Sequence, residues 1–164
     1  MLRILLIEDS DSDAYIIQKA IHDHVKDAVC SRVANAKAGE EYLQKRRADI
    51  ILLDLGLPDS SNPADTYTRI CRHAGKIPIV ISTNIHDHAL AMTLVHEGAE
   101  DYLNKDLIVD KPEHVRDAIT FAIERHALLQ KAMSEKEEAV KESEQKDTVL
   151  NCFMGGYSVS NRKK

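Results

Sequence analysis

The segment Asp49-Ile-Ile-Leu-Leu-Asp-Leu-Gly-Leu-Pro58 contains an uninterrupted aliphatic run that ends at the carboxylate of Asp54. A short run of this kind is typical of a strand that is covered on both faces of a parallel sheet. Ligands of such sheets bind in the crevice beyond the carboxyl ends of the strands. We therefore expect Asp54 to lie at that edge, where it can contact a ligand.

Three other apolar runs also end on polar side chains. These are residues 4–7 followed by Glu8 and Asp9, residues 79–81 followed by Ser82 and Thr83, and residues 101–104 followed by Lys105. If the runs are strands of one parallel sheet, three acids, a hydroxyl and an ammonium group meet in one pocket. Such a pocket suits a divalent cation and a phosphoryl group.

Helical stretches alternate with these strands, and this alternation is typical of βαβ units around a parallel sheet. We predict five strands and four intervening helices up to about residue 104. The predicted strands are 4–7, 28–33, 48–53, 78–83 and 101–104, and the predicted helices are 11–24, 36–46, 63–74 and 87–97.

One long helix is expected from Pro112 onward, because the sequence contains no Gly or Pro between Glu113 and Met154. Its first part has apolar residues at helical spacing that would cover the sheet. These residues are Val115, Ala118, Ile119, Ala122 and Ile123. We therefore assign residues 1–125 to a globular domain, residues 126–154 to a helical extension and residues 155–164 to a flexible basic tail.

The extension has only a weak heptad seam, formed by Leu129, Met133, Val140 and Leu150. One interpretation is a solvated single helix that is stabilised by i,i+4 pairs such as Glu137–Lys141. The other is a two-stranded coiled coil or a signalling linker, and a coiled coil would make the chain a homodimer. The sequence leaves both interpretations open.

Composition limits the classes of partner. The formal net charge of −5 gives no general attraction to nucleic acid, and we expect no nucleic-acid partner. No run of about 18 apolar residues is present, so we expect no membrane association. Three scattered cysteines indicate reduced thiols, and Met1 leads directly into a strand without a signal peptide, so we expect a cytoplasmic protein.

The acids and the lysine have a chemistry in common. Oxygen ligands from Glu8, Asp9 and Asp54 suit Mg²⁺. A carboxylate such as Asp54 can act as a nucleophile and form an acyl phosphate, while Lys105 neutralises charge on the phosphoryl oxygens. Each residue alone has an ordinary structural explanation, such as helix capping by the acids. Only their combination indicates a functional site.

The segments ILLIEDS (4–10), DIILLDLGLP (49–58), IPIVIST (77–83) and GAEDYLNK (98–105) occur in an order that resembles the receiver domain of bacterial two-component response regulators. The resemblance covers about residues 1–125. It implies a flavodoxin-like α/β fold with a doubly wound five-stranded parallel sheet in the order 2-1-3-4-5 and, here, an extended C-terminal helix.

The resemblance also implies roles for the residues of the acidic pocket. Asp54 corresponds to the phospho-acceptor. Asp9 corresponds to the direct Mg²⁺ ligand, Glu8 acts on the cation through water, and Gly56 offers its backbone carbonyl. Lys105 corresponds to the lysine of the family.

Two further residues correspond to the conformational switch of the family. Thr83 matches the switch hydroxyl, with Ser82 as the competing candidate, and Tyr102 matches the switch aromatic residue. Two of the departures from the family pattern lie next to residues of the site. Asp106 follows the lysine where a proline is usual, and Asn84 is bulkier than the residue that usually follows the hydroxyl.

The resemblance implies a regulatory domain rather than an enzyme. The expected donor is a sensor histidine kinase or a histidine phosphotransfer protein, and the expected output is a change in partner binding or dimerisation. A second interpretation is a receiver-like scaffold that acts through its C-terminal helix without phosphorylation. An Asp-dependent phosphatase is disfavoured, because it would need a second Asp at position 56, which is Gly.

Overall fold

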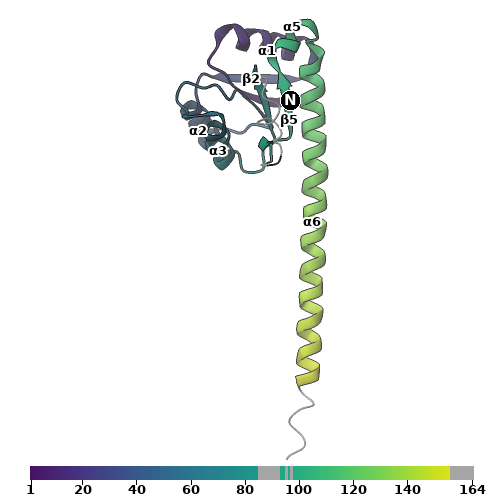
Figure 1. Cartoon of the computed structure of the whole chain (residues 1–164). Coiled ribbons are helices and arrows are strands. Elements are labelled where there is room, and N and C mark those ends of the chain that lie inside the picture. The colour runs from purple at the N-terminus through teal and green to yellow at the C-terminus, as the bar shows by residue number, and fades with distance from the viewer. Residues whose placement is uncertain (85–92, 95, 97, 156–164) are drawn as a thin grey trace, which may run out of the picture. The chain divides into compact units, whose positions relative to one another are not determined.

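A computed structural model of the chain describes residues 1–84, 93, 94, 96 and 98–155 (Figure 1). The helix expected at 87–97 falls mostly outside the described residues. The tail beyond Gly155 lies outside them as well.

The described residues include a parallel sheet of five strands in the order β2-β1-β3-β4-β5, which confirms the predicted topology. The strands are β1 (Leu2–Ile7), β2 (Ala28–Val33), β3 (Ile50–Leu53), β4 (Ile79–Thr83) and β5 (Asp101–Asn104). The register pairs Ile7 with Leu53 and Leu53 with Ile81. The residues that follow these strands therefore emerge at one edge of the sheet.

Local capping explains where the first helices begin. The described helices are α1 (Asp11–His24), α2 (Ala36–Lys45), α3 (Pro63–Ala74), α5 (Lys105–Asp110) and α6 (Glu113–Gly155). Ser10, Asn35 and Asn62 precede α1, α2 and α3, and the side chain of each accepts a hydrogen bond from the third residue after it. Such caps satisfy amide groups that have no partner inside the helix.

Alternate residues of the strands enter two separate cores. Ile4 and Leu6 of β1 pack in a cluster with α1 and the first part of α6. Leu5 and Ile7 pack in a second cluster with α2 and α3, which lie together on the other side of the sheet (Figure 1). Both faces of the sheet are therefore covered, as the uninterrupted apolar runs predict.

Helix α5 is a feature that the sequence prediction missed. The side chain of Asn104 caps it by accepting a hydrogen bond of 2.9 Å from the amide of Asp106. A proline at position 106 would have no such amide, so the departure from the family pattern has a local structural use. Ile108 of α5 is buried in the core with α1. Six residues are too few for a helical period to stand out in the sequence.

The contacts of the chain divide it into two compact units, Met1–His126 and Ala127–Lys164. In the second unit, the described residues continue α6 with exposed, charged side chains. Lys141 and Glu137 form the predicted i,i+4 pair at 2.8 Å. Leu128, Leu129, Met133 and Val140 are exposed. No described helix is long and apolar enough to cross a membrane.

The start of α6 is expected to be an integral part of the core. Ile119 is 1% exposed, so Ile119→Ala should lower the free energy of unfolding by about 3 kcal/mol through lost burial and a cavity. Phe121, two residues later, is 55% exposed, and Phe121→Ala should change it by less than about 0.5 kcal/mol. Urea denaturation of both variants measures the difference. Equal effects would contradict this packing.

Candidate functional site

A pocket of about 300 Å³ lies at the carboxyl edge of the sheet. Its lining residues come from the segments that follow β1, β3, β4 and β5. They are Glu8, Asp9, Ser10, Asp13, Asp54, Gly56, Asn84 and Lys105. The structure thus brings together the acids and the lysine that the sequence places at separate strand ends.

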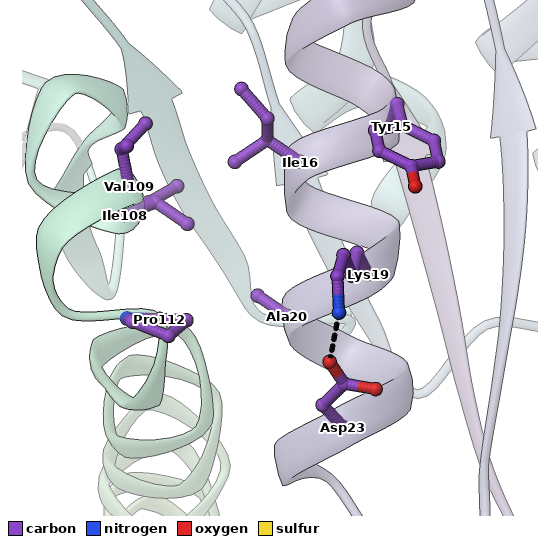
Figure 2. Close-up of a pocket in the computed structure, with 8 residues that line it drawn as sticks. All are labelled: Tyr15, Ile16, Lys19, Ala20, Asp23, Ile108, Val109 and Pro112. Carbon is purple, nitrogen blue, oxygen red and sulfur yellow. Dashed lines mark hydrogen bonds and ion pairs between the residues drawn. The ribbon is translucent and has the colours of Figure 1, made fainter.

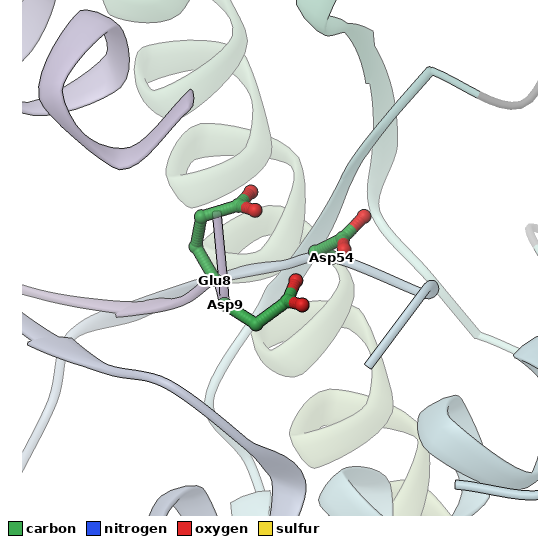
Figure 3. A group of neighbouring side chains, drawn as sticks. All are labelled: Glu8, Asp9 and Asp54. Atoms are coloured by element: carbon green, nitrogen blue, oxygen red, sulfur yellow. The ribbon is translucent and has the colours of Figure 1, made fainter. Parts of the chain in front are cut away.

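Three acids of this pocket form a candidate cation site (Figure 3). Glu8, Asp9 and Asp54 each offer one carboxylate oxygen, and these oxygens lie within 4.8 Å of one another. Glu8 is fully buried and Asp54 is 6% exposed, whereas Asp9 is exposed. A set of oxygen-only ligands with one solvated member fits Mg²⁺, which keeps several waters when it binds to proteins.

Gly56 lines the same pocket and faces Asp54. A Cβ atom at this position would lie 3.3 Å from Asp54 Oδ2, which is tighter than an ordinary contact. Glycine therefore leaves room around the Asp54 carboxylate.

Lys105 is the counter-charge of the acidic group. Its Nζ lies 2.6 Å from Glu8 Oε2, 3.1 Å from Asp54 Oδ1 and 3.3 Å from Asp13 Oδ2. The lysine side chain is only 8% exposed, so little water screens these ion pairs. One ammonium group thus contacts three carboxylates, two of which are buried.

Burial and charge shift the proton affinities in this cluster. Burial raises the pKa of Glu8, and the nearby Asp54 charge adds to that increase, while Lys105 and the amide of Ser10 oppose it. Burial alone would lower the pKa of Lys105, but its contacts with Glu8 and Asp54 outweigh that effect and the pKa is raised. The Lys105 ammonium group therefore keeps its proton more firmly than a solvated lysine does, whereas the Glu8 carboxylate takes up a proton more readily than a solvated carboxylate does.

Sequence reasoning missed Asp13 as a member of this site. Asp13 lies in the first turn of α1, and its amide donates to the Ser10 hydroxyl at 3.3 Å. The amide of Ser10 in turn donates to Glu8 Oε1 at 3.1 Å. Asp13 lies three residues after the helix cap Ser10, and this spacing indicates only helix capping. Nothing in the local sequence indicates that Asp13 contacts Lys105.

The predicted switch residues lie on β4 and β5. Thr83 is the last residue of β4, opposite Asn104, and its side chain is outside the described atoms. Ser82 is fully buried, and its Oγ has no hydrogen-bond partner among the described residues. Tyr102 packs against the core cluster that strand residues form with helices α2 and α3. Burial raises the pKa of its phenol, and the charge of Asp106 acts in the same direction.

A second pocket of about 240 Å³ lies between α1 and the α5 segment (Figure 2). Its walls are mainly apolar and include Ile16, Ile108 and Pro112. The two charged groups at its rim, Lys19 and Asp23, already pair with each other at 2.6 Å. This pocket therefore offers no set of groups comparable to the acidic cluster.

Comparison with known proteins relates this chain to a large family. The response regulator receiver domain matches residues 4–107. The chain is 29% identical over 124 residues to the transcriptional regulatory protein PhoP of Escherichia coli O157:H7, a match that covers 72% of this chain and 49% of PhoP. The chain spans about half the length of the curated relatives it matches first.

Solved structures share the fold. A response regulator receiver domain protein from Clostridium thermocellum superposes with a TM-score of 0.65 at 21% identity, covering 79% of this chain and 99% of that one. A response regulator from Burkholderia pseudomallei, with a phosphorylated aspartic acid, a calcium ion and citrate, gives 0.61 at 17% identity, covering 83% and 75%.

Removing the lysine is expected to destabilise the protein in a pH-dependent way. Lys105→Met leaves the buried Glu8 carboxylate without its counter-charge, so the free energy of unfolding should fall by about 3 kcal/mol near pH 8. Because the native pKa of Glu8 is raised, its protonated form favours the native state. That contribution is complete below the unfolded-state pKa and is lost as the pH rises through the native value. The deficit should therefore shrink toward pH 5.

Urea denaturation at both pH values measures this deficit. Lys19→Met is the matched control, since it breaks an exposed pair with Asp23 and should change the free energy of unfolding by less than about 0.5 kcal/mol at either pH. A deficit of Lys105→Met that is the same at both pH values would contradict the role of Glu8.

Proposed function

Since this chain belongs to the family of response regulator receiver domains, we propose that it accepts a phosphoryl group on Asp54 from a sensor histidine kinase or a histidine phosphotransfer protein. The observation that carries the proposal is the grouping of Asp54 with Glu8, Asp9 and Lys105 in one pocket. The domain is regulatory in this proposal, and the cytoplasmic location expected from the sequence belongs to the same proposal.

The chemistry follows from the position of Asp54. Its carboxylate oxygen attacks the phosphorus, and the bond between phosphorus and the imidazole nitrogen of the donor breaks, with the electron pair leaving on that nitrogen. Lys105 lies 3.1 Å from Asp54 Oδ1 and is placed to pair with an oxygen of the transferred group.

Glu8, Asp9, Asp54 and the Gly56 carbonyl are the proposed ligands of Mg²⁺. When bound, Mg²⁺ neutralises charge on the phosphoryl oxygens and on the acids. The mutual approach of three carboxylate oxygens within 4.8 Å supports this set, because the single charge of Lys105 offsets only part of their repulsion.

We further propose that phosphorylation shifts an equilibrium between two conformations through Thr83 and Tyr102. Thr83 ends β4 and pairs with Asn104 of β5, while Ile81 pairs with Tyr102. A movement at the end of β4 is therefore adjacent to the strand that carries Tyr102. Ser82 is the weaker candidate for the switch hydroxyl, because its side chain is already fully buried.

Replacing the acceptor tests the proposal directly. Wild-type protein incubated with Mg²⁺ and acetyl phosphate should gain the mass of one phosphoryl group, and Asp54→Asn should gain none, because the amide is not a nucleophile. Intact-mass spectrometry measures both. Asp49→Asn, at the opposite end of the same strand, is the matched control and should be labelled like the wild type. Stoichiometric labelling of Asp54→Asn would falsify the assignment of the acceptor.

The exposed apolar residues of α6 favour self-association as a candidate output. Leu128 and Leu129 are 68% and 57% exposed, and Met133 is 65% exposed. Isolated helices of this kind are marginal in water, so a partner normally decides whether they form. The sequence pattern alone suggests an interface through residues 122–150, but Ala122 is fully buried in the core. We therefore propose a weak parallel homodimer through residues 127–150, which phosphorylation of Asp54 favours.

Sedimentation of the full chain and of a chain ending at His126 tests the dimer, each with and without acetyl phosphate. The full chain should associate more strongly after phosphorylation, and the shorter chain should remain monomeric, because it lacks Leu128, Leu129 and Met133. Leu129→Glu in the full chain should weaken association, whereas the exposed control Val29→Glu on β2 should not. A full chain that stays monomeric at high micromolar concentration in both states leaves α6 as a solvated helix or a site for another protein.

A further inference from the structure

The guanidinium of Arg32 holds the segment that carries two of the three clustered acids. Arg32 lies near the end of β2, and its side chain is 23% exposed. Nε donates to the carbonyl of Glu8 at 2.9 Å, and Nη2 donates to the carbonyl of Asp9 at 2.9 Å. Nη1 donates to the Asp11 carboxylate at 2.6 Å. One planar group thus binds three successive parts of the connection between β1 and α1.

The two carbonyl contacts fix the backbone of this connection. The amide of Glu8 already donates to the carbonyl of Val33 at 2.9 Å, so β2 holds the segment through both its backbone and Arg32. A guanidinium presents donors in a rigid plane, and it therefore sets the relative orientation of the two carbonyls that it binds. A flexible ammonium group cannot impose that geometry.

Asp9 is the acid whose position depends most on its backbone. The Glu8 carboxylate is held directly by the Ser10 amide and by Lys105. Asp9 is exposed, and its carboxylate has no hydrogen-bond or ion-pair partner among the described residues. The placement of that carboxylate beside Glu8 and Asp54 therefore rests on the backbone that Arg32 holds.

We propose that Arg32 is a positioning residue of the cation site, which binds the carbonyls of Glu8 and Asp9 and thereby holds the Asp9 carboxylate ready for a divalent cation. This inference rests on the proposed function of the acidic pocket. Groups that orient metal ligands commonly change metal affinity about 10- to 100-fold when they are replaced. Asp9 is one ligand of several, so the lower end of that range is expected here.

A purely electrostatic role would have the opposite effect. The positive charge of Arg32 lies next to the acids and repels a cation, so its removal alone would strengthen Mg²⁺ binding. A positioning role predicts weaker binding when the planar group is lost, whether or not the charge is kept. The two roles therefore differ in the sign of the change in the Mg²⁺ dissociation constant.

The test compares Arg32→Lys, which keeps the charge, with Arg32→Gln, which removes it. Mg²⁺ affinity is measured by calorimetric titration and by the rise in melting temperature with Mg²⁺ concentration. Arg32→Lys should bind Mg²⁺ about tenfold more weakly than the wild type, and Arg32→Gln should also bind it more weakly but by a smaller factor, because removal of the charge partly offsets the loss of positioning. Unchanged or tighter binding by both variants would overturn the proposal. Should Arg32→Gln not fold, the result for Arg32→Lys decides by itself, since this variant keeps the charge and the aliphatic stem.

Arg3→Gln is the matched control for general destabilisation. Arg3 also binds a carboxylate through two nitrogens, that of Asp49, but at the opposite end of β1. Its loss should lower the melting temperature and leave the Mg²⁺ dissociation constant unchanged. If Arg3→Gln weakened Mg²⁺ binding as much as the Arg32 variants do, the effect would be one of stability, and the positioning role would be wrong.

Phosphorylation by acetyl phosphate separates this inference from the proposed function. In Arg32→Lys, the Mg²⁺ concentration for half-maximal labelling rate should rise about tenfold, while the rate at saturating Mg²⁺ stays near that of the wild type. Failure of the wild type to be labelled at Asp54 would refute the proposed function. Labelling of wild type and variants with the same Mg²⁺ dependence would refute only the role of Arg32.

Discussion

The structure of the pocket depends on the ion pair between Lys105 and the buried carboxylate of Glu8. Glu8 is fully buried, and a buried charge is tolerated only when an opposite charge and hydrogen bonds compensate for lost hydration. Lys105 follows β5, whereas Glu8 follows β1, and β3 and β4 lie between these strands in the sheet. The ammonium group must therefore reach across the edge of the sheet, and Asp54 after β3 lies along its way at 3.1 Å. The strand order thus determines which side chains meet in the pocket.

The same arrangement explains why the pocket is suited to accept a charged group. Three clustered carboxylates and one lysine leave an excess of negative charge, which a divalent cation can neutralise. Burial in a site with little water raises the pKa of Glu8, whereas the carboxylates beside Lys105 raise its pKa against the effect of burial. Charges that are compensated but not fully satisfied are common at functional sites, where local stability is sacrificed.

The contacts that shape the acidic segment come from more than one direction. Lys105 binds the Glu8 side chain from β5, and Arg32 binds the Glu8 and Asp9 carbonyls from β2. The segment that carries Glu8 and Asp9 thus lies between two positively charged side chains. Lys105 contacts it in the pocket, and Arg32 contacts its backbone from β2.

Helix α6 has a buried part and an exposed part. Its first part is buried in the core as far as Ala122, whereas Leu128 and Leu129 are exposed. One periodic helix therefore serves both as a wall of the core and as a candidate surface for association.

The sequence by itself determined the five strands, the capped helices α1 to α3 and the identity of the acids. Uninterrupted aliphatic runs, caps such as Ser10 and strand-end acids such as Asp54 are local patterns with a fixed physical meaning. Only the tertiary structure decided which distant groups touch. Lys105 and Asp13 are 92 residues apart, and Arg32 is 24 residues from Glu8. No local spacing encodes these contacts, because they follow from strand order, from register and from the direction of side chains in a folded sheet. The short helix α5 also escaped prediction, since its six residues are stabilised by the Asn104 cap and by burial of Ile108 rather than by a periodic pattern.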